Sequence, residues 1–358
     1  MLPLVLVLAS AGADAAPVIT SPVGSGKKGF AGDGGPAAKA ELDQPFDVAF
    51  DKAGNLYFSD TFNHLVRKVD AKTGTITTVA GNGRKGFGGD GGKATEASLN
   101  EPYGIELDAD GNLYIVDRLN FCVRKVDGKT AVISTVAGTG GKVGYGGDGG
   151  PANKALLVEP NGLCLDGKGG LYIADVAGHR VRAVDLATGT ISTLLGNGKG
   201  VTAGDGGPIK DATLNGPRAV AVGPNGRLYV VERNGHCVRV IDLAKGRIER
   251  FAGTGKKGYT GDGTKALDAT FDGPKEIDID KDGNVFVVDT ENEVIRKIDA
   301  KSGVVTTIAG KGRTKTPGLG DNGPATGATL GRPHGVAVGP DGALYIGDTN
   351  SHRIRKVK

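Results

Sequence analysis

The sequence predicts an all-β protein, a six-bladed β-propeller of four-stranded antiparallel blades. A motif of the form P-x-G-V-A-V-D-x-x-G-N-L-Y-V-x-D-x-x-N-H-x-V-R-K-V-D occurs six times in the 358 residues. The acid after its second apolar run recurs every 57 to 59 residues, at Asp60, Asp117, Asp175, Glu232, Asp289 and Asp348. Repeats of this length are typical of propellers and solenoids. A solenoid needs capping units, and no copy of the motif resembles one.

Each copy of the motif contains four strand signals. In the first copy, apolar alternation predicts strands at residues 45–51 and 56–60, joined by a turn that contains Gly54. Residues 64–70 form a third run, and a turn that closes at Gly74 leads to a β-branched fourth run at residues 75–80. Sheets of this kind bury both faces against their neighbours in a propeller. The expected blades span residues 45–80, 102–137, 160–195, 217–252, 274–309 and 333–358.

The two ends of the repeat region predict how the ring closes. The last copy contains only three strands, whereas residues 17–24 align with the outer strand of the first blade. We therefore expect residues 17–24 to complete the sixth blade. Pro22 is compatible with this position, because an outermost strand has one unpaired edge. Residues 17–358 are expected to form a single propeller domain.

Residues 1–16 have a different character from the repeats. Residues 2–9 are an apolar core of signal-peptide length, and residues 13–16 offer a small-x-small cleavage site. The run is too short to span a bilayer. We therefore predict a signal peptide at residues 1–16 and a secreted or periplasmic protein.

The repeat resembles the NHL repeat over residues 17–358. Asn63, His64 and Leu65 spell the motif that names this family, and His179, His236 and His352 stand at the equivalent position in other copies. The resemblance implies the six-bladed fold. It does not imply one activity, because similar propellers serve as binding platforms, extracellular sensor domains, lyases and lactonases.

Residues present in every copy are most simply explained by folding. We expect the repeated histidines to bond to Asp or Arg within a blade, and the repeated arginines to pair with the repeated acid. Each connection between blades also carries an Asp beside glycines, followed by one short helix. This pattern lacks the further oxygen ligands of a calcium loop, so turn and helix-start hydrogen bonding is expected. The loop acids are Asp33, Asp90, Asp148, Asp205, Asp262 and Asp321.

The residue after the repeated proline differs in every copy. These positions lie where the inner strands enter near the axis, and varied side chains at a concave mouth are what selective ligand contact requires. A solvated rim that tolerates any residue would also explain the variation. We predict a ligand-binding rim, for a small molecule or a protein, at Phe46, Tyr103, Asn161, Arg218, Lys275 and His334.

Four acids break the small-residue pattern further along the inner strands, at Asp47, Glu106, Glu276 and Asp278. They could hold a divalent cation such as Ca²⁺, act as acid and base, or pair with Arg218 and Lys275. Carboxylates in a water-filled channel would also explain them. No Ser-His-Asp arrangement, phosphate-binding loop or cysteine-based metal spacing is present, so no catalytic residue is assigned and no cofactor is required.

The connections between blades also carry cations next to aromatic residues, which would form a basic collar on one face. Lys27, Lys28, Lys256 and Lys257 are examples beside Phe30 and Tyr259. The net charge of only +4 argues against nucleic acid as the partner, and solvated lysines around an aromatic lid over the short helix would explain the pattern. We predict a monomeric extracytoplasmic binding scaffold that acts through its loop-rich face and channel mouth. The alternatives are a lactonase-like metal-dependent hydrolase or lyase in the channel, and polyanion or nucleic-acid binding by the collar.

Overall fold

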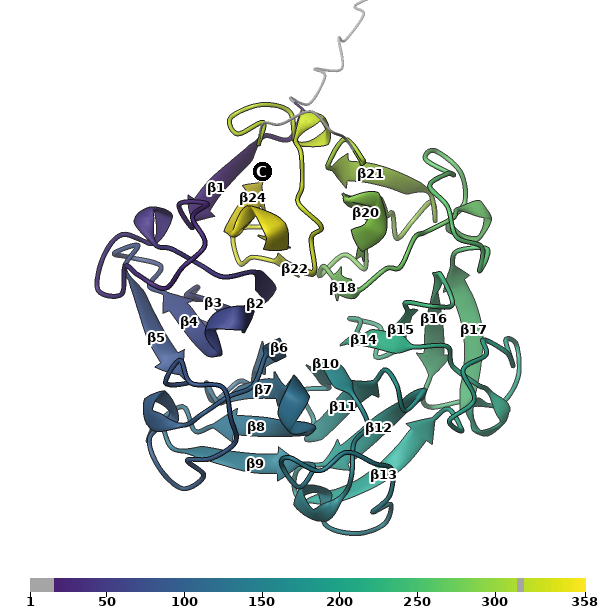
Figure 1. The fold of residues 1–358 in the computed structure, drawn as a ribbon. Helices are drawn as coiled ribbons and strands as arrows, with labels where there is room; N and C mark the ends of the chain where they lie inside the picture. Colours follow the sequence, from purple (N-terminus) through teal and green to yellow (C-terminus); the bar gives the residue numbers. More distant parts are fainter. Residues whose placement is uncertain (1–15, 314–318) are drawn as a thin grey trace, which may run out of the picture.

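The chain forms six four-stranded antiparallel sheets that stand as blades around a central axis (Figure 1). The computed structural model describes residues 16–313 and 319–358. In each blade the first strand of the motif lies nearest the axis, and the strands follow outward in chain order. The predicted six-bladed propeller is confirmed.

The first three blades each consist of four consecutive strands. Blade 1 comprises β2 (Pro45–Phe50), β3 (Leu56–Asp60), β4 (Leu65–Val69) and β5 (Ile76–Ala80). Blade 2 comprises β6 (Pro102–Leu107), β7 (Leu113–Asp117), β8 (Cys122–Val126) and β9 (Ile133–Ala137). Blade 3 comprises β10 (Pro160–Leu165), β11 (Gly170–Asp175), β12 (Arg180–Asp185) and β13 (Thr190–Leu195).

Blades 4 and 5 follow the same plan, whereas blade 6 draws on both ends of the repeat region. Blade 4 comprises β14 (Pro217–Val222), β15 (Leu228–Glu232), β16 (Cys237–Asp242) and β17 (Arg247–Ala252). Blade 5 comprises β18 (Glu276–Ile279), β19 (Val285–Asp289), β20 (Val294–Ile298) and β21 (Val305–Ala309). Blade 6 comprises β22 (Gly335–Val338), β23 (Leu344–Asp348), β24 (Arg353–Val357) and β1 (Ile19–Val23).

Strand β1 closes the ring as expected. It pairs antiparallel with β24, with Ile19 opposite Val357 and Val23 opposite Ile354. Figure 1 shows this purple strand beside the yellow C-terminal strands. The register shifts between Thr20 and Val23, where Pro22 stands, so the proline occupies an irregular part of an outer strand. Of the predicted signal peptide, residues 1–16, only Ala16 lies within the described part of the chain.

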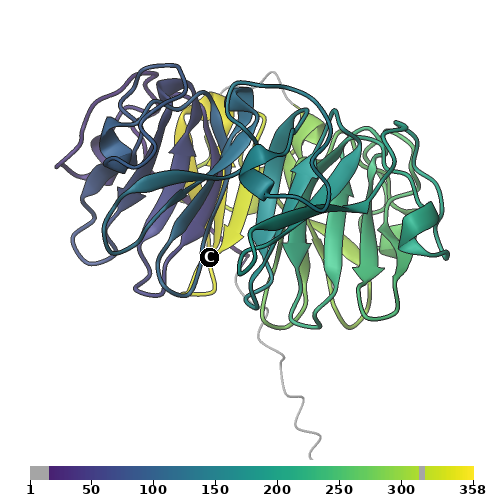
Figure 2. The same ribbon diagram turned by 90° about the horizontal axis from the view of Figure 1, so that it is seen from below.

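Short 3₁₀ helices mark two kinds of connection. One kind precedes each blade and is the predicted short helix: η1 (Ala37–Lys39), η3 (Ala94–Glu96), η5 (Ala152–Lys154), η6 (Ile209–Asp211), η7 (Ala266–Asp268) and η9 (Ala325–Gly327). The other follows the second strand of a blade: η2 (Thr61–Asn63), η4 (Arg118–Asn120), η8 (Thr290–Asn292) and η10 (Thr349–Ser351). We call the side on which the long connections reach the inner strands the loop face. In side view, the tight hairpins gather along the opposite edge of the ring (Figure 2).

The hydrophobic core consists of one buried cluster at each junction between neighbouring blades. At the closing junction, Phe58 and Ile76 of blade 1 pack with Ala337 and Ile354 of blade 6. Each blade therefore completes the core of its neighbours, as a closed ring requires. Within the described residues, no helix is long and apolar enough to cross a membrane.

The repeated arginine joins each blade to the connection that precedes it. Arg67 has no solvent exposure, and its guanidinium lies 3.4 Å from Asp60 and 2.7 Å from the loop acid Asp33. Pairing with the repeated acid is confirmed here and in blades 2, 4, 5 and 6. The predicted helix-start role of the loop acid is wrong, because the connection folds back and brings the acid to the arginine. The equivalent pairs are Asp90–Arg124, Asp148–Arg182, Asp205–Arg239, Asp262–Arg296 and Asp321–Arg355.

The repeated histidines connect neighbouring blades, and the prediction of a bond to Asp or Arg within one blade is wrong. His64 accepts a hydrogen bond at Nδ1 from the backbone N–H of Glu101, at 3.2 Å, in the connection to blade 2. His64 itself has a φ of 58°, so the chain turns here and aims the ring away from its own blade. The equivalent bonds join His179 to Gly216, His236 to Gly273 and His352 to Gln44.

Candidate functional site: the channel and its mouth

A cavity of about 280 Å³ lies on the axis, lined by the inner strands of all six blades. Its wall extends to the inner-strand ends that lie away from the loop face, at Phe50, Leu107, Leu165, Val222 and Val338. The four predicted channel acids, Asp47, Glu106, Glu276 and Asp278, all line this cavity. All four acids therefore line one cavity, around the axis.

Three of the channel acids bridge neighbouring blades through backbone hydrogen bonds. The backbone N–H of Ile105 donates to Asp47 Oδ2 at 2.8 Å, and that of Leu165 donates to Glu106 Oε2 at 2.9 Å. Val338 donates in the same way to Asp278 Oδ2 at 2.7 Å. An inner strand of a blade has one unpaired edge, and its N–H groups need acceptors. These carboxylates supply them and so hold the inner strands in register.

The same bonds limit what the acids offer to a metal ion. The second oxygens of Asp47 and Asp278 accept the N–H groups of Val48 and Ile279, at 2.8 and 2.7 Å. A calcium ion takes six to eight oxygen ligands. Across residues 16–313 and 319–358, no three or more His, Cys, Asp and Glu side chains are grouped to hold a metal ion. These bonds occupy oxygens that a calcium ion would need, and the predicted Ca²⁺ remains a prediction.

Burial raises the pKa of every channel acid. The pKa of Asp47 rises to about 7, that of Glu106 to about 8 and that of Asp278 to about 6. Burial also raises the pKa of Glu276 well above its usual range, and repulsion from Asp47 adds to this effect. At neutral pH the set is therefore partly protonated, and the channel carries fewer than four negative charges.

The six rim residues lie on the loop-face side of the cavity, and all except Asn161 contact another rim residue at the axis. They are buried rather than spread around an open mouth, with exposed fractions of 3 to 9%. The Phe46 ring stacks between Tyr103 and His334, with ring centroids 4.4 and 4.1 Å away. These three residues come from blades 1, 2 and 6, so one half of the rim is aromatic.

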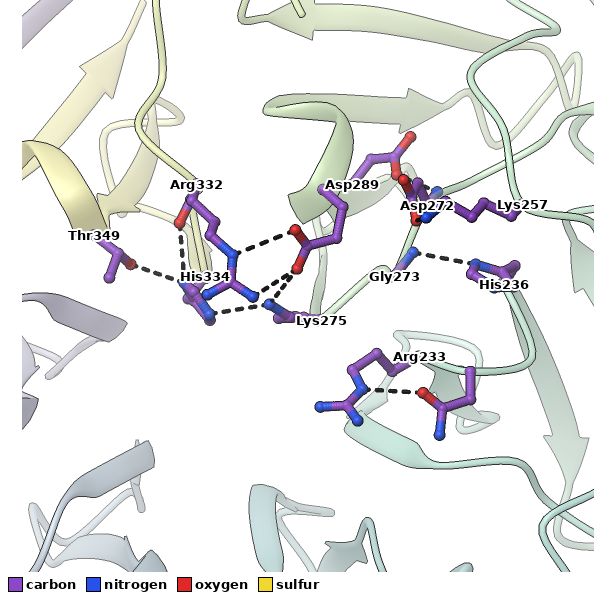
Figure 3. A network of polar contacts seen from close by, with 12 residues as sticks. Arg233, His236, Lys257, Asp272, Gly273, Lys275, Asp289, Arg332, His334 and Thr349 are labelled. Atoms are coloured by element: carbon purple, nitrogen blue, oxygen red, sulfur yellow. Dashed lines mark hydrogen bonds and ion pairs between the residues drawn. The ribbon is translucent and has the colours of Figure 1, made fainter. Parts of the chain in front are cut away.

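The other half of the rim is polar and cationic. Lys275 Nζ lies 3.2 Å from His334 Nε2 and 2.9 Å from Glu291 Oε1. His334 Nδ1 lies 3.0 Å from the Arg332 carbonyl and 3.0 Å from Thr349 Oγ1, as Figure 3 shows. Burial lowers the pKa of Lys275 to about 8, and burial with the nearby cations keeps the pKa of His334 well below its usual value.

Arg218 and Asn161 complete the rim with different surroundings. Arg218 lies over the Tyr103 ring, with its guanidinium carbon 5.0 Å from the ring centroid. Asn161 donates through Nδ2 to the Glu159 carbonyl, which leaves its side chain within its own blade. Lys275 and Arg218 thus bring two cationic groups into one small region. Among the described residues, an acid pairs with Lys275 but none pairs with Arg218.

The charged residues that surround the six rim residues were not predicted from the sequence. Arg118 pairs with Glu101 at 2.7 Å and with Glu159 at 2.6 Å, and Glu291 pairs with both Lys275 and Arg332. Arg118 follows the repeated acid, where three other copies have threonine. Comparison of the copies at this position would have identified it, just as the same comparison identified the rim.

The aromatic residues of the loop collar cover the buried arginines. Phe30 lies 5.3 Å from the Arg67 guanidinium carbon, and Tyr259 lies 5.2 Å from that of Arg296. The sequence suggested that these aromatic residues cover the short helix, whereas in the structure they cover the buried arginine. Two collar lysines pair with acids on the same face, Lys28 with Asp43 at 3.4 Å and Lys257 with Asp272 at 3.5 Å.

Comparison with known proteins supports the repeat assignment. The family model "Teneurin NHL domain" matches residues 82–144 and 248–317, and the model "NHL repeat" matches residues 214–241 and 330–357. NHL repeat-containing protein 2 of Bos taurus is 27% identical over 345 residues, which cover 87% of this chain and 46% of that protein. The chain spans less than half the length of the first curated relatives it matches.

Solved structures share the propeller. An auxiliary nutrient binding protein from Bacteroides thetaiotaomicron superposes with a TM-score of 0.69 at 18% identity, over 96% of this chain and 76% of that one. A gluconolactonase from Xanthomonas campestris has a TM-score of 0.57 at 14% identity, over 96% of this chain and 94% of that one. At such identities these structures support the fold alone. The repeat, the closed ring and the family models lead to one conclusion: this chain belongs to the NHL-repeat six-bladed β-propellers.

Proposed function

We propose that this protein is an extracytoplasmic binding module whose ligand contacts the rim at the mouth of the channel, on the loop face. The observation that carries the proposal is that five of the six rim residues, each of a different type, form one cluster at the axis. They are Phe46, Tyr103, His334, Lys275 and Arg218. Folding alone does not require six different residues at equivalent positions. Selective contact with one ligand would explain why these residues differ.

The composition of the cluster supports a ligand with both flat and polar parts. Phe46, Tyr103 and His334 form a stacked aromatic half, and Arg218 and Lys275 bring cations to the other half. The propeller neighbour from Bacteroides thetaiotaomicron is an auxiliary nutrient binding protein, which is consistent with small-ligand binding. The apolar run at residues 2–9 is the basis for proposing an extracytoplasmic location.

A ligand screen with rim variants tests the proposal. Purified protein is screened by thermal shift against monosaccharides, amino acids, organic acids, short peptides and heparin, because a ligand of the folded state raises the melting temperature. We expect a compound whose effect on wild type is reduced in Phe46→Leu. The matched control is Phe58→Leu, which changes a buried residue of the same blade away from the axis and should keep the full effect. An unchanged effect in Phe46→Leu would contradict the proposal.

A second candidate is hydrolase or lyase activity in the channel, favoured by the four acids that line one cavity. The propeller neighbour from Xanthomonas campestris is a gluconolactonase. Added Ca²⁺ should then raise the melting temperature of wild type, and Glu276→Ala/Asp278→Ala should abolish this effect. Calcium without effect on wild type would remove the metal-dependent alternative. Heparin binding that is lost when Lys27, Lys28, Lys256 and Lys257 are changed to Glu would instead favour the collar.

A further inference from the structure

Arg218 is a buried cation without a protein partner. Its exposed fraction is 5%, yet no side chain or carbonyl among the described residues accepts a hydrogen bond from its guanidinium. Buried polar groups are almost always bonded to protein or to water. The Arg218 nitrogens are not among the fully buried, unbonded atoms of the described residues, so they still reach solvent at the mouth, where an anion could contact them. The fully buried arginines of the repeat show the contrast, because Arg239 in the same blade pairs with Asp205 and Glu232.

The acids near the mouth are already engaged with other cations. Glu101 and Glu159 both pair with Arg118. Glu291 pairs with Lys275 and Arg332. The channel acids Glu276 and Asp47 attract Arg218 from one layer below, but neither forms an ion pair with it. Arg218 therefore adds positive charge to the mouth without compensation by a contacting acid.

The surroundings of Arg218 favour a flat anion. The guanidinium lies over Tyr103, whose ring stacks on Phe46, and the Lys275 ammonium belongs to the same rim. Guanidinium binds carboxylate through two parallel hydrogen bonds in one plane. A doubly charged phosphate would meet stronger repulsion from the acids of the channel. The site thus suits a single negative charge next to an apolar, planar group.

We infer that Arg218 binds the carboxylate of a small organic acid at the mouth of the channel, with the rest of the ligand against the aromatic half of the rim. This inference rests on the proposed function, since it names the chemical class of the ligand bound there. Arg218 serves the ligand rather than the fold. The unliganded protein should then gain stability, or lose none, when this charge is removed.

Benzoate and its neutral isostere benzamide test the inference by thermal shift and calorimetry. We expect benzoate to raise the melting temperature of wild type more than benzamide does. In Arg218→Met, benzoate should bind at least about 10-fold more weakly, which is the usual effect of losing a hydrogen bond to a charged group. Arg227→Met, an exposed arginine of the same blade, should leave the binding of benzoate unchanged.

Stability without ligand gives an independent measurement. Arg218→Met should melt at or above the wild-type temperature, whereas Arg239→Met should melt well below it because two acids lose their partner. A melting temperature of Arg218→Met as low as that of Arg239→Met would overturn the inference, as would benzoate without effect on wild type. If another compound binds more weakly to Phe46→Leu but equally well to Arg218→Met and wild type, the proposed function stands, and only the assignment of a carboxylate ligand fails.

Discussion

Glu106 has two effects on the inner strand of blade 2. It stands where other copies have Ala49, Cys164, Ala221 and Ala337, and it accepts the N–H of Leu165 from the next blade. The same burial that positions this carboxylate raises its pKa to about 8. Above that pH, the bridge between blades therefore requires a charged carboxylate that is removed from water, which lowers the stability of the fold.

The raised pKa of Glu106 gives a prediction for Glu106→Gln. Between the usual glutamate pKa of about 4.3 and pH 8, the folded protein binds more protons at this site than the unfolded chain does. The contribution of Glu106 to the free energy of unfolding is therefore fully present at pH 4 and is lost as the pH rises to 8. Glutamine keeps an acceptor for Leu165 without the charge, so the variant should exceed wild type by about 1–3 kcal/mol at pH 8.5 and match it at pH 4.

Urea unfolding at both pH values measures this difference. Asp110→Asn, which removes an exposed acid from blade 2, serves as the control and should shift stability little at either pH. A Glu106→Gln protein that is less stable than wild type at pH 8.5 would show that the charge itself supports the fold.

At the scale of elements, each connection is fastened to its blade by the buried arginine. Arg67 contacts acids of both the strand and the loop, and it also donates to the carbonyls of Glu41 and Ala31. The loop acid Asp33 continues this link by accepting the N–H of Thr78 on the outer strand. Loop, third strand and fourth strand are thus joined around one guanidinium.

Arg67→Met should destabilise the protein by about 3–5 kcal/mol, because it leaves Asp60 buried without its cation. Lys68→Met, on the same strand, is the matched control and should cost less than about 1 kcal/mol. Chemical unfolding of the two variants gives the comparison. Equal losses in both would mean that the fold does not depend on the buried pair.

The histidine links between blades predict an effect of acid. Burial lowers the pKa of His236, whose Nδ1 must stay unprotonated to accept the N–H of Gly273. Below the usual histidine pKa of about 6.5, the unfolded chain takes up the proton first, so this site loses stability as pH falls. His236→Asn keeps an acceptor and suits the φ of 48°.

The difference in unfolding free energy between His236→Asn and wild type should therefore move in favour of the variant between pH 7 and pH 5. The variant is compared with wild type at each pH because both proteins contain the channel acids, whose effect on stability changes with pH in the opposite direction. Thermal unfolding at several pH values measures the difference, and a difference independent of pH would contradict the assigned role of His236.

At the scale of the whole molecule, β1 decides whether the ring is closed. Ile19 is fully buried and packs in the cluster between blades 5 and 6. Ile19→Ala should cost about 2–5 kcal/mol, as expected for a large apolar residue in a well-packed core. Val18→Ala, at a neighbouring residue that is 41% exposed, should cost much less. Calorimetry would show a single cooperative transition at lower temperature in Ile19→Ala, and an unchanged transition would contradict closure by β1.

The fold was predictable from the sequence because each blade has the same needs and therefore repeats the same residues. The rim was also identifiable, since Phe46, Arg218 and their equivalents break that repeat. The partners of Asp33 and His64 were not predictable. Asp33 meets Arg67 because a glycine-rich connection folds back, and His64 meets Glu101 because the residue turns into a left-handed conformation.

The sequence by itself determined the number of blades, the order of their strands and the closure by β1, because apolar periodicity and repeat length are local properties of the chain. Only the tertiary structure decided what lies at the axis. The stacking of Phe46 on Tyr103 and His334, and the absence of a contacting acid for Arg218 among the described residues, depend on distances across a ring. Those distances are set by how six blades pack together, which no single copy of the repeat encodes.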